Sequence, residues 1–199
     1  MSGAAPTIAL FGTSADPPTA GHRALLQGLA RHYDRVATWA SDNPLKHHAA
    51  PLATRTALLQ ALVDDLGEPT VMLEQSLSSP HALRSLERAA ELWPAAQLVF
   101  VIGGDLVPQI PHWHRAEEVL QRCRLAVVPR QGWELDGAAL ERLRQLGGHP
   151  ELVPLPVPAT ASSQIRRQPS PELVPAALWP ELVKHNLYGL GQHPPNGLP

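Results

Sequence analysis

The chain has 199 residues, of which 44% are hydrophobic and 17% are charged, so it is long enough for one globular domain with a substantial core. This composition excludes an intrinsically disordered protein. The 16 Lys and Arg residues and 18 Asp and Glu residues give a formal net charge of -2, so we predict no broad basic surface and no nucleic-acid partner.

The sequence lacks the features of an exported or membrane protein. Its one cysteine, Cys123, cannot form a disulfide within the chain and is predicted to be a small packed residue. The opening segment MSGAAPTIALF lacks the positively charged region of a signal peptide, and no apolar run approaches the length of a membrane span. We therefore expect a cytoplasmic protein with no membrane contact.

Apolar runs typical of buried parallel strands alternate along the chain with segments of helical periodicity. The predicted strands are residues 7–11, 35–40, 70–74, 97–102 and 124–129, with a weaker, proline-containing edge strand at 151–156. The predicted helices are residues 21–33, 55–66, 81–93, 116–122 and 137–146, followed by short helices at 162–167 and 171–185. This alternation predicts an α/β fold, a doubly wound parallel sheet with helices on both faces. We expect one domain, 1–190, and a flexible proline-rich tail, 191–199.

Polar loops follow the first four predicted strands. Their sequences are GTSADPPTAGH, SDNPLKHH, EQSLSSPH and GGDLVPQIPHWH, all rich in Gly, Pro or His. In open parallel sheets, ligands bind at the carboxyl ends of the strands. We therefore expect a site assembled from these loops.

The loop after the first strand is the most informative of them. Gly12 and Thr13 add little bulk, which lets backbone N–H groups approach a phosphate. Thr19 and His22 lie at the expected start of the next helix, where unpaired N–H groups and the helix dipole favour an anion. The alternative is an ordinary turn before a capped helix, and the local residues leave both open.

Three further positions carry candidate ligand groups. Lys46 follows the second strand and could place a point charge on a phosphate, or be merely solvated. Asp105 follows the fourth strand and Gly103, where a carboxylate can reach a ribose hydroxyl or a magnesium-bound water, or cap the next helix. Trp113 could stack on an aromatic ring or cover the core.

The segment SSQIRR combines hydroxyls with a cation. Ser162 and Ser163 can cap a helix or donate to a ligand, and Arg166 lies on the same helical face as Ser163. That geometry suits a triphosphate, although a lone SSxxR is more often an ordinary capped helix with a solvated arginine.

Adjacent histidines raise the possibility of a zinc site. His47 and His48 are neighbours, and His112 and His114 flank Trp113. No HExxH motif or pair of cysteines completes a ligand set, so we expect no metal centre built from protein side chains.

Three motifs in order resemble a known family. The T-x-G-H of Thr19 to His22, behind a strand and G-T, resembles the (H/T)xGH signature of the nucleotidyltransferase superfamily. VIGGDLVPQIPHW is similar to the family's IGxD followed by a tryptophan, and SSQIRR is similar to its SSTxIR. From about Ile8 to Arg167 the chain is most similar to bacterial nicotinate-nucleotide adenylyltransferases, with the cyanobacterial form in GTSADPPTAGH.

The chain departs from the family pattern at several positions. Thr19 stands where this family usually has histidine, one extra residue lies between Thr13 and Asp16, and Ser163 replaces the usual threonine. The threonine that helps hold a nicotinate carboxylate aligns with Ala82, beside His81.

The resemblance implies a Rossmann-like fold and a reaction in which AMP moves from ATP to nicotinate mononucleotide, giving deamido-NAD and pyrophosphate, with Mg²⁺ as cofactor. It implies that His22 and Thr19 contact phosphates near the reacting centre. The implied ATP-binding residues are Gly12, Thr13, Gly103, Asp105, Ser163 and Arg166, and the implied acceptor-binding residues are Lys46, His81 and Trp113.

Two other functions stay open at this point. A sister transferase acting on nicotinamide mononucleotide or phosphopantetheine would share the T-x-G-H loop and differ in its acceptor pocket. A non-catalytic nucleotide-binding protein would keep the fold alone, but retention of His22, Arg166 and the strand-end loops argues against it.

Overall fold

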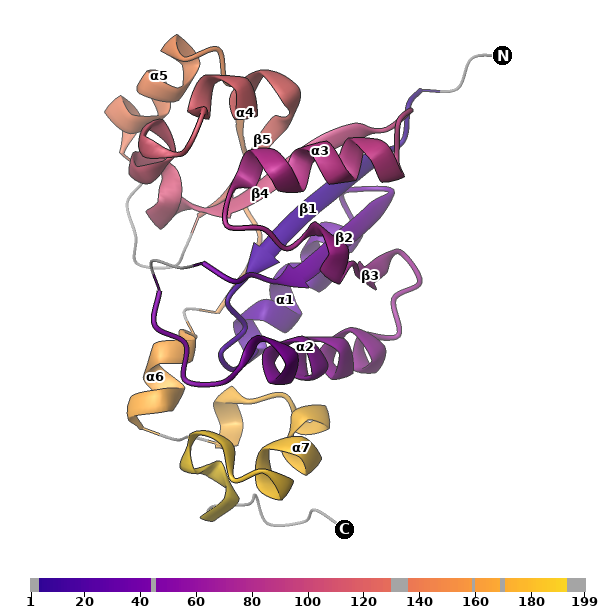
Figure 1. Ribbon diagram of the computed structural model, residues 1–199, viewed down its shortest axis with the longest axis vertical. Helices are drawn as coiled ribbons and strands as arrows, with labels where there is room; N and C mark the ends of the chain where they lie inside the picture. The colour runs from indigo at the N-terminus through magenta and orange to yellow at the C-terminus, as the bar shows by residue number, and fades with distance from the viewer. Residues whose placement is uncertain (1–3, 44–45, 130–135, 159, 169–170, 193–199) are drawn as a thin grey trace.

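A computed structural model describes residues 4–43, 46–129, 136–158, 160–168 and 171–192. Its centre is a parallel sheet of six strands in the order β3-β2-β1-β4-β5-β6 (Figure 1). The strands are β1 Thr7–Thr13, β2 Arg35–Ala40, β3 Val71–Leu73, β4 Gln97–Gly103, β5 Arg124–Val128 and β6 Pro150–Leu152. The predicted α/β fold with a doubly wound parallel sheet is confirmed.

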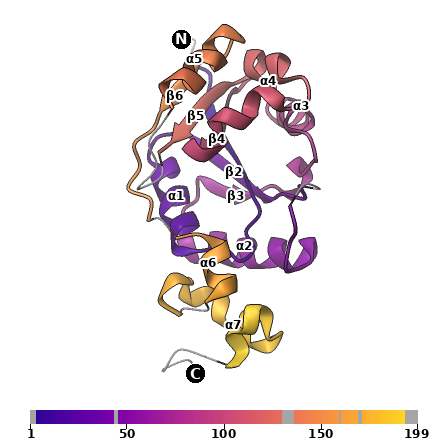
Figure 2. The same ribbon diagram turned by 90° about the vertical axis from the view of Figure 1, so that its left-hand side faces the viewer.

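Helices cover both faces of this sheet. The α-helices are α1 Ala20–Ala30, α2 Leu52–Leu66, α3 Ala82–Leu92, α4 Ala116–Arg122, α5 Gly137–Gln145, α6 Ser162–Arg167 and α7 Trp179–Lys184. The 3-10 helices are η1 Gln75–Leu77, η2 Gly104–His112, η3 Pro171–Leu173, η4 Ala176–Leu178 and η5 Leu187–Gln192. Figures 1 and 2 show α1 and α2 on one side of the sheet and α3 and α4 on the other.

The central strand β1 has side chains in two hydrophobic cores, as the two-residue period of a strand requires. Ala9 and Phe11 belong to the cluster that includes Leu26 of α1, whereas Ile8 and Leu10 belong to the cluster that includes Leu86 of α3. The chain passes from β1 to β2 on one side and later to β4 on the other. The strand order therefore reverses between β1 and β4, which places a crevice at their carboxyl ends.

Prolines cause the main differences from the predicted elements. β6 ends at Leu152, short of the predicted 151–156, because Pro154 has no N–H for the sheet. The segment after β4, predicted as a loop, forms η2 with Pro108 and Pro111 inside it. The segment 171–185, predicted to form short helices, contains η3, η4 and α7, and Pro175 disfavours helix at the residue before it.

The C-terminal segment packs against the α1 and α2 side of the molecule. Trp179, Leu182 and Leu190 are buried in the same cluster as Leu26, and α7 lies beyond α2 in Figure 1. η5 continues to Gln192, two residues past the predicted domain boundary. The rest of the predicted tail, 193–199, lies outside the described residues.

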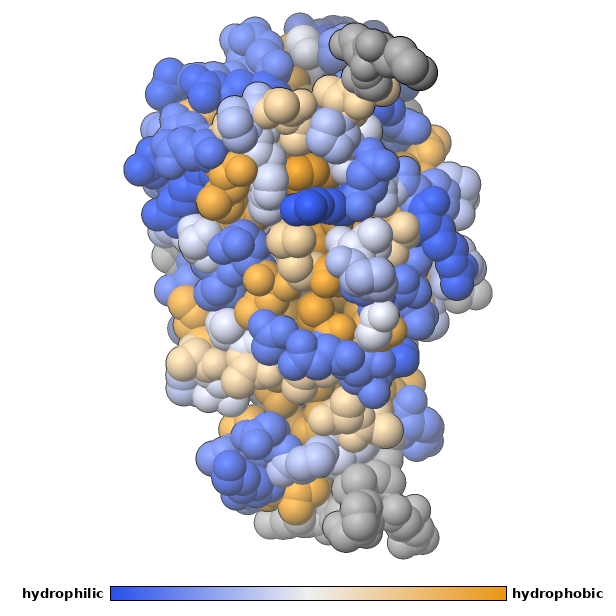
Figure 3. Space-filling view, turned by 90° about the vertical axis from the view of Figure 1, so that its right-hand side faces the viewer, coloured by the Kyte–Doolittle hydropathy of each residue, from blue (hydrophilic) through white to orange (hydrophobic). Residues whose placement is uncertain are grey.

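The surface on the β3 side of the molecule is mostly hydrophilic. Figure 3 shows hydrophobic residues gathered near the middle of this face, with hydrophilic residues around them. In the part of the chain that the structure describes, no helix is long and apolar enough to cross a membrane.

Candidate active site

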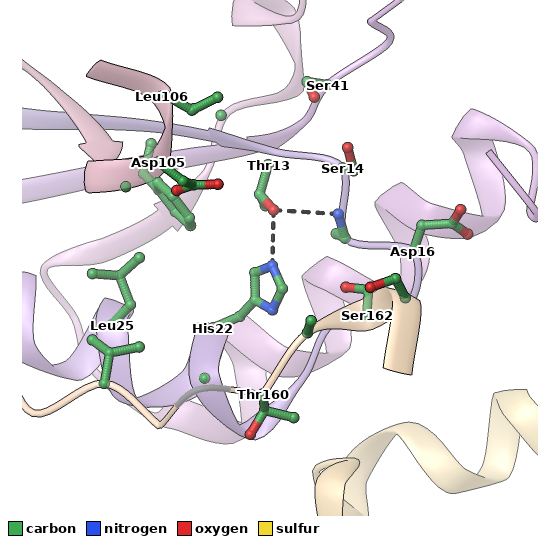
Figure 4. A pocket seen from close by; sticks show the side chains of 18 of the residues that line it. Thr13, Ser14, Asp16, His22, Leu25, Ser41, Asp105, Leu106, Thr160 and Ser162 are labelled. Carbon is green, nitrogen blue, oxygen red and sulfur yellow. Dashed lines mark hydrogen bonds between the residues drawn. The ribbon is translucent and has the colours of Figure 1, made fainter. Parts of the chain in front are cut away.

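A cavity of about 520 Å³ lies at the carboxyl ends of β1 and β4 (Figure 4). It is bordered by the loop after β1, residues 46–48, the start of η2 and the start of α6. The structure brings eight of the predicted site residues together in its wall: Gly12, Thr13, His22, Lys46, Gly103, Asp105, Ser163 and Arg166. The cavity lies where the strand order reverses, which is the position that the sequence predicts for a ligand site.

His22 is held at the start of α1 by a capping box. The Thr19 side chain accepts from the backbone N–H of His22, and Nδ1 of His22 accepts from the backbone N–H of Thr19 at 3.1 Å. Because Nδ1 accepts, a neutral imidazole carries its proton on Nε2. Nε2 lies 2.8 Å from Oγ1 of Thr13, so the ring presents a donor on the cavity side (Figure 4).

Thr19 differs from its predicted place at a phosphate. Its side chain is fully buried, and Oγ1 contacts Nδ1 of His22 at 2.8 Å and the carbonyl oxygen of Thr160 at 3.3 Å. A residue that caps a helix N-terminus turns its hydroxyl toward the helix and away from solvent. The structure thus places Thr19 behind the imidazole, where it fixes the ring.

Both predicted glycines lie in the cavity wall, but only Gly12 faces a fixed group, whereas Gly103 faces the end of the flexible Asp105 side chain. A Cβ atom at Gly12 would lie 2.7 Å from the ring of Trp39, and one at Gly103 would lie 2.5 Å from Oδ1 of Asp105. Trp39 is buried, so it cannot move aside. Both glycines therefore shape the cavity wall, as the low bulk of the loops indicated.

Asp105 lies in the first turn of η2 and lines the cavity. Its carboxylate faces the same space as Thr13 and His22 (Figure 4). A carboxylate across from an imidazole donor gives the cavity both an acceptor and a donor, which suits a ligand with hydroxyl and phosphate groups.

Asp16 lines the cavity but was not predicted from the sequence as a site residue. It is 1% exposed, and its carboxylate accepts from the backbone N–H groups of Ala49 at 2.7 Å and Ala50 at 3.1 Å. Nη1 of Arg166 donates to the carbonyl oxygen of Asp16 and lies 3.7 Å from its Oδ2. Asp16 thereby joins the loop after β2 to α6.

Arg55 is a second residue that sequence reasoning missed. Its side chain is 1% exposed, and it donates to the carbonyl oxygens of Ser14 at 2.7 Å, Ser41 at 2.8 Å and Ala50 at 3.1 Å. The guanidinium therefore ties the ends of β1 and β2 to the start of α2. An arginine in a helical pattern predicts a solvated surface residue, so no sequence signal marked it.

The loop after β2 places two basic residues at the cavity. Lys46 is exposed and lines the opening, as expected for a flexible point charge. Burial, together with the charge of Arg55, lowers the pKa of His48, while Asp16 opposes this shift. His48 therefore favours its neutral form. Nε2 of His48 and Oγ of Ser14 are buried without a hydrogen-bond partner among the described residues.

His81 and Trp113, like Thr19, are predicted site residues that do not line this cavity. His81 caps α3, and its ring centre is 4.8 Å from that of His114. Trp113 ends η2 and packs edge-on against Phe100, with ring centres 6.0 Å apart. Trp113 is thus partly a core residue, whereas the sequence placed it at a loop tip.

Two further predictions concern the Cys123 thiol and a metal site built from side chains. Burial raises the pKa of the Cys123 thiol to about 12, and its sulfur donates to the carbonyl oxygen of Val119 at 3.3 Å. The predicted packed role of Cys123 is confirmed. Within the described ranges, no group of three or more His, Cys, Asp or Glu side chains could hold a metal ion.

The fold and cavity define a class of protein. It is a parallel α/β domain in which a Thr–His capping box lies at the carboxyl ends of the strands, where such sheets bind nucleotides. A family model for cytidylyltransferase-like proteins matches residues 10–170. A Synechocystis protein with the printed name "probable nicotinate-nucleotide adenylyltransferase" is 40% identical over 91% of this chain and 98% of its own length. A Chlorobaculum tepidum protein of the same name is 31% identical, over 90% of this chain and 97% of its own.

Solved structures show the same fold. Plasmodium falciparum nicotinic acid mononucleotide adenylyltransferase, complexed with NaAD, superimposes with a TM-score of 0.76 at 18% identity, over 92% of this chain and 98% of that one. The chain belongs to the cytidylyltransferase-like family and, within it, to the nicotinate-nucleotide adenylyltransferases. It is thus an enzyme of the nucleotidyltransferase type, as the three sequence motifs implied.

Proposed function

We propose that this protein transfers AMP from ATP to nicotinate mononucleotide, giving deamido-NAD and pyrophosphate. The observation that carries the proposal is the fixed His22 imidazole, whose Nε2 donor lies beside Thr13 in the cavity. The names of the relatives support it. So does the complex of the Plasmodium falciparum enzyme with NaAD, the product that this reaction would form.

The chemistry needs alignment and charge stabilisation, with no covalent intermediate. An oxygen of the acceptor's 5'-phosphate attacks the α-phosphorus of ATP in line, a new P–O bond forms, and the bond to the leaving pyrophosphate breaks. The His22 Nε2–H would donate to an oxygen of the α-phosphate as negative charge develops. Thr19 would act through the ring, by fixing its tautomer and orientation.

The proposed ATP site uses both sides of the cavity. The backbone at Gly12 and Thr13 would cradle the phosphates, with Ser163 and Arg166 at the β- and γ-phosphates. Asp105, made accessible by Gly103, would accept from a ribose hydroxyl or face a magnesium-bound water.

Mg²⁺ fits this site as a partner of the triphosphate. Mg²⁺ prefers oxygen ligands and keeps several waters, so phosphate oxygens and one carboxylate suffice. Asp105 is the carboxylate on the cavity wall that would contact the ion or its water. The bound ion would neutralise charge on the leaving pyrophosphate.

The proposed acceptor site uses Lys46, His81 and Trp113. Lys46 would meet the acceptor phosphate at the cavity opening. Imidazole N–H groups of His81 and of His114, which lies beside it, would donate to the nicotinate carboxylate, and Trp113 would offer a ring for stacking. N–H donors directed at the carboxyl substituent of the ring favour an acid over a neutral amide.

Pyrophosphate release with ATP, Mg²⁺ and a panel of acceptors tests the proposal. We expect the highest kcat/KM with nicotinate mononucleotide, lower values with nicotinamide mononucleotide, and none above background with phosphopantetheine. Binding of ATP without release for any acceptor would instead indicate a nucleotide-binding protein without catalysis.

A further inference from the structure

The buried carboxylate of Asp16 is held by three parts of the chain that are distant in sequence. The loop after β2 supplies the N–H groups of Ala49 and Ala50, and α6 supplies Arg166. The third partner is Tyr188 in η5, whose hydroxyl donates to Oδ1 of Asp16 at 2.7 Å. Asp16 thus links the C-terminal segment to a side chain in the cavity wall.

The backbone around Tyr188 is shaped to turn this side chain inward. Asn186 and Tyr188 have positive φ angles of 44° and 56°, and Gly189 has one of 71°. Non-glycine residues seldom adopt this conformation, which requires support from surrounding contacts. Leu190, which is fully buried in the core, supplies an anchor directly after the turn.

The Tyr188 hydroxyl is a neutral donor. Burial raises its pKa well above the ordinary value, and the hydrogen bond to Asp16 and the negative charge of that carboxylate raise it further. A phenol that stays protonated donates to a buried carboxylate at all physiological pH values. Its loss would leave the charged Asp16 one donor short.

Arg166 stands between this buried pair and the cavity. Its contacts with Asp16 use Nη1 alone, and its side chain is 31% exposed. Among the residues that the structure describes, the guanidinium has donors left for a ligand in the cavity. A fixed Asp16 therefore orients Arg166 so that part of its guanidinium group faces the cavity.

We propose that Tyr188 is a positioning residue for nucleotide binding: it fixes Asp16, whose carbonyl oxygen accepts from Arg166 and whose carboxylate pairs with it at 3.7 Å, so that Arg166 is held for the triphosphate. The proposal rests on the proposed function, in which Arg166 binds the β- and γ-phosphates. It assigns to the C-terminal segment a role in substrate affinity in addition to packing.

The test is a double-mutant cycle in the full chain, with KM for ATP measured by pyrophosphate release. Tyr188→Phe removes the hydroxyl alone, and we expect KM for ATP to rise about tenfold, with KM for nicotinate mononucleotide little changed. Tyr33→Phe is the matched control, because Tyr33 packs on the core outside the cavity. It should keep the wild-type KM for ATP.

The second arm of the cycle separates positioning from general stability. Arg166→Ala should raise KM for ATP, and adding Tyr188→Phe to it should raise KM no further, because Tyr188 acts through Arg166. Additive effects, or a wild-type KM for ATP in Tyr188→Phe, would overturn the proposal. An inactive wild-type protein, or an Arg166→Ala variant with unchanged KM, would instead count against the proposed function.

A measurement on the wild-type protein keeps the proposal testable if a variant does not fold. Amide hydrogen exchange of residues 186–190 is compared with and without a non-hydrolysable ATP analogue. We expect slower exchange in this segment when the analogue is bound, because both ends of the Tyr188–Asp16–Arg166 chain are then fixed. Unchanged exchange in residues 186–190, together with slower exchange of residues that line the cavity, would overturn the proposal.

Discussion

Nε2 of His22 lies 2.8 Å from the hydroxyl oxygen of Thr13, while Nδ1 of the same ring accepts from the backbone of Thr19. The helix start thereby sets both the orientation and the tautomer of the imidazole. A ring fixed in this way needs no reorganisation when charge develops on a phosphate, which is the condition for strong electrostatic stabilisation.

Replacing His22 with alanine should therefore lower kcat by about a hundredfold to a thousandfold, the usual effect of losing one such donor. Steady-state pyrophosphate release measures the loss, and circular dichroism checks that the fold is retained. The control is His185→Ala, an exposed residue of the C-terminal segment that pairs with Glu181. A near wild-type kcat for His22→Ala would show that the site is assigned to the wrong residue.

Gly12→Ala should destabilise the protein by about 1–3 kcal/mol, because the added methyl group would lie 2.7 Å from the buried ring of Trp39. Thermal or urea unfolding gives the value. Gly137→Ala is the matched control, since a Cβ there meets no atom of the described residues within 4 Å. If the two variants lose the same unfolding free energy, then Trp39 does not exclude a side chain at position 12.

Arg55→Leu should cost about 3 kcal/mol of unfolding free energy, since it removes the guanidinium donors from the buried carbonyl group of Ala50 and the part-buried carbonyl groups of Ser14 and Ser41. Urea denaturation measures it. Arg84→Leu, which removes an exposed pair with Glu87, should change stability little. Equal effects of the two changes on stability would contradict the inference that Arg55 ties the ends of β1 and β2 to the start of α2.

Deleting residues 191–199 should change neither activity nor melting temperature appreciably, because Leu190 is the last residue known to be buried in the core. Deleting residues 187–199 should lower both, since it also removes Tyr188 and Leu190. Differential scanning calorimetry and pyrophosphate release compare the two truncations. A large drop in melting temperature for the shorter deletion would show that residues after 190 pack on the domain.

Trp113→Ala should lower kcat/KM for nicotinate mononucleotide far more than it weakens ATP binding, if the indole stacks on the pyridine ring. Because Trp113 also packs against Phe100, Trp113→Phe serves as the control that keeps an aromatic ring there. Comparing kcat/KM for nicotinate and nicotinamide mononucleotides in the wild-type protein tests the acid preference. Equal or reversed values would refute that preference and leave the adenylyl transfer itself standing.

The sequence predicted the features that depend on near neighbours along the chain. The strand and helix alternation, the strand-end loops and the Thr19–His22 start of α1 follow from local periodicity and capping rules, and the structure has them. Arg55 and the Asp16–Tyr188 pair follow from no such rule. Asp16 and Tyr188 are 172 positions apart, and a local pattern carries no information about a contact of that separation.

The partly buried position of Trp113 was missed for a related reason. Trp113 follows a loop-like, proline-rich stretch, and only the packed structure brings Phe100 to its edge.

The separation of Asp16 from Tyr188 also has a consequence for the protein as it is synthesised. β1 and the loop that carries Asp16 leave the ribosome well before Tyr188, which is 172 positions further along the chain. Contacts between such distant positions form late in folding. A nascent chain that stops short of residue 188 therefore has its central strand, but lacks the hydroxyl that completes the support of the cavity wall.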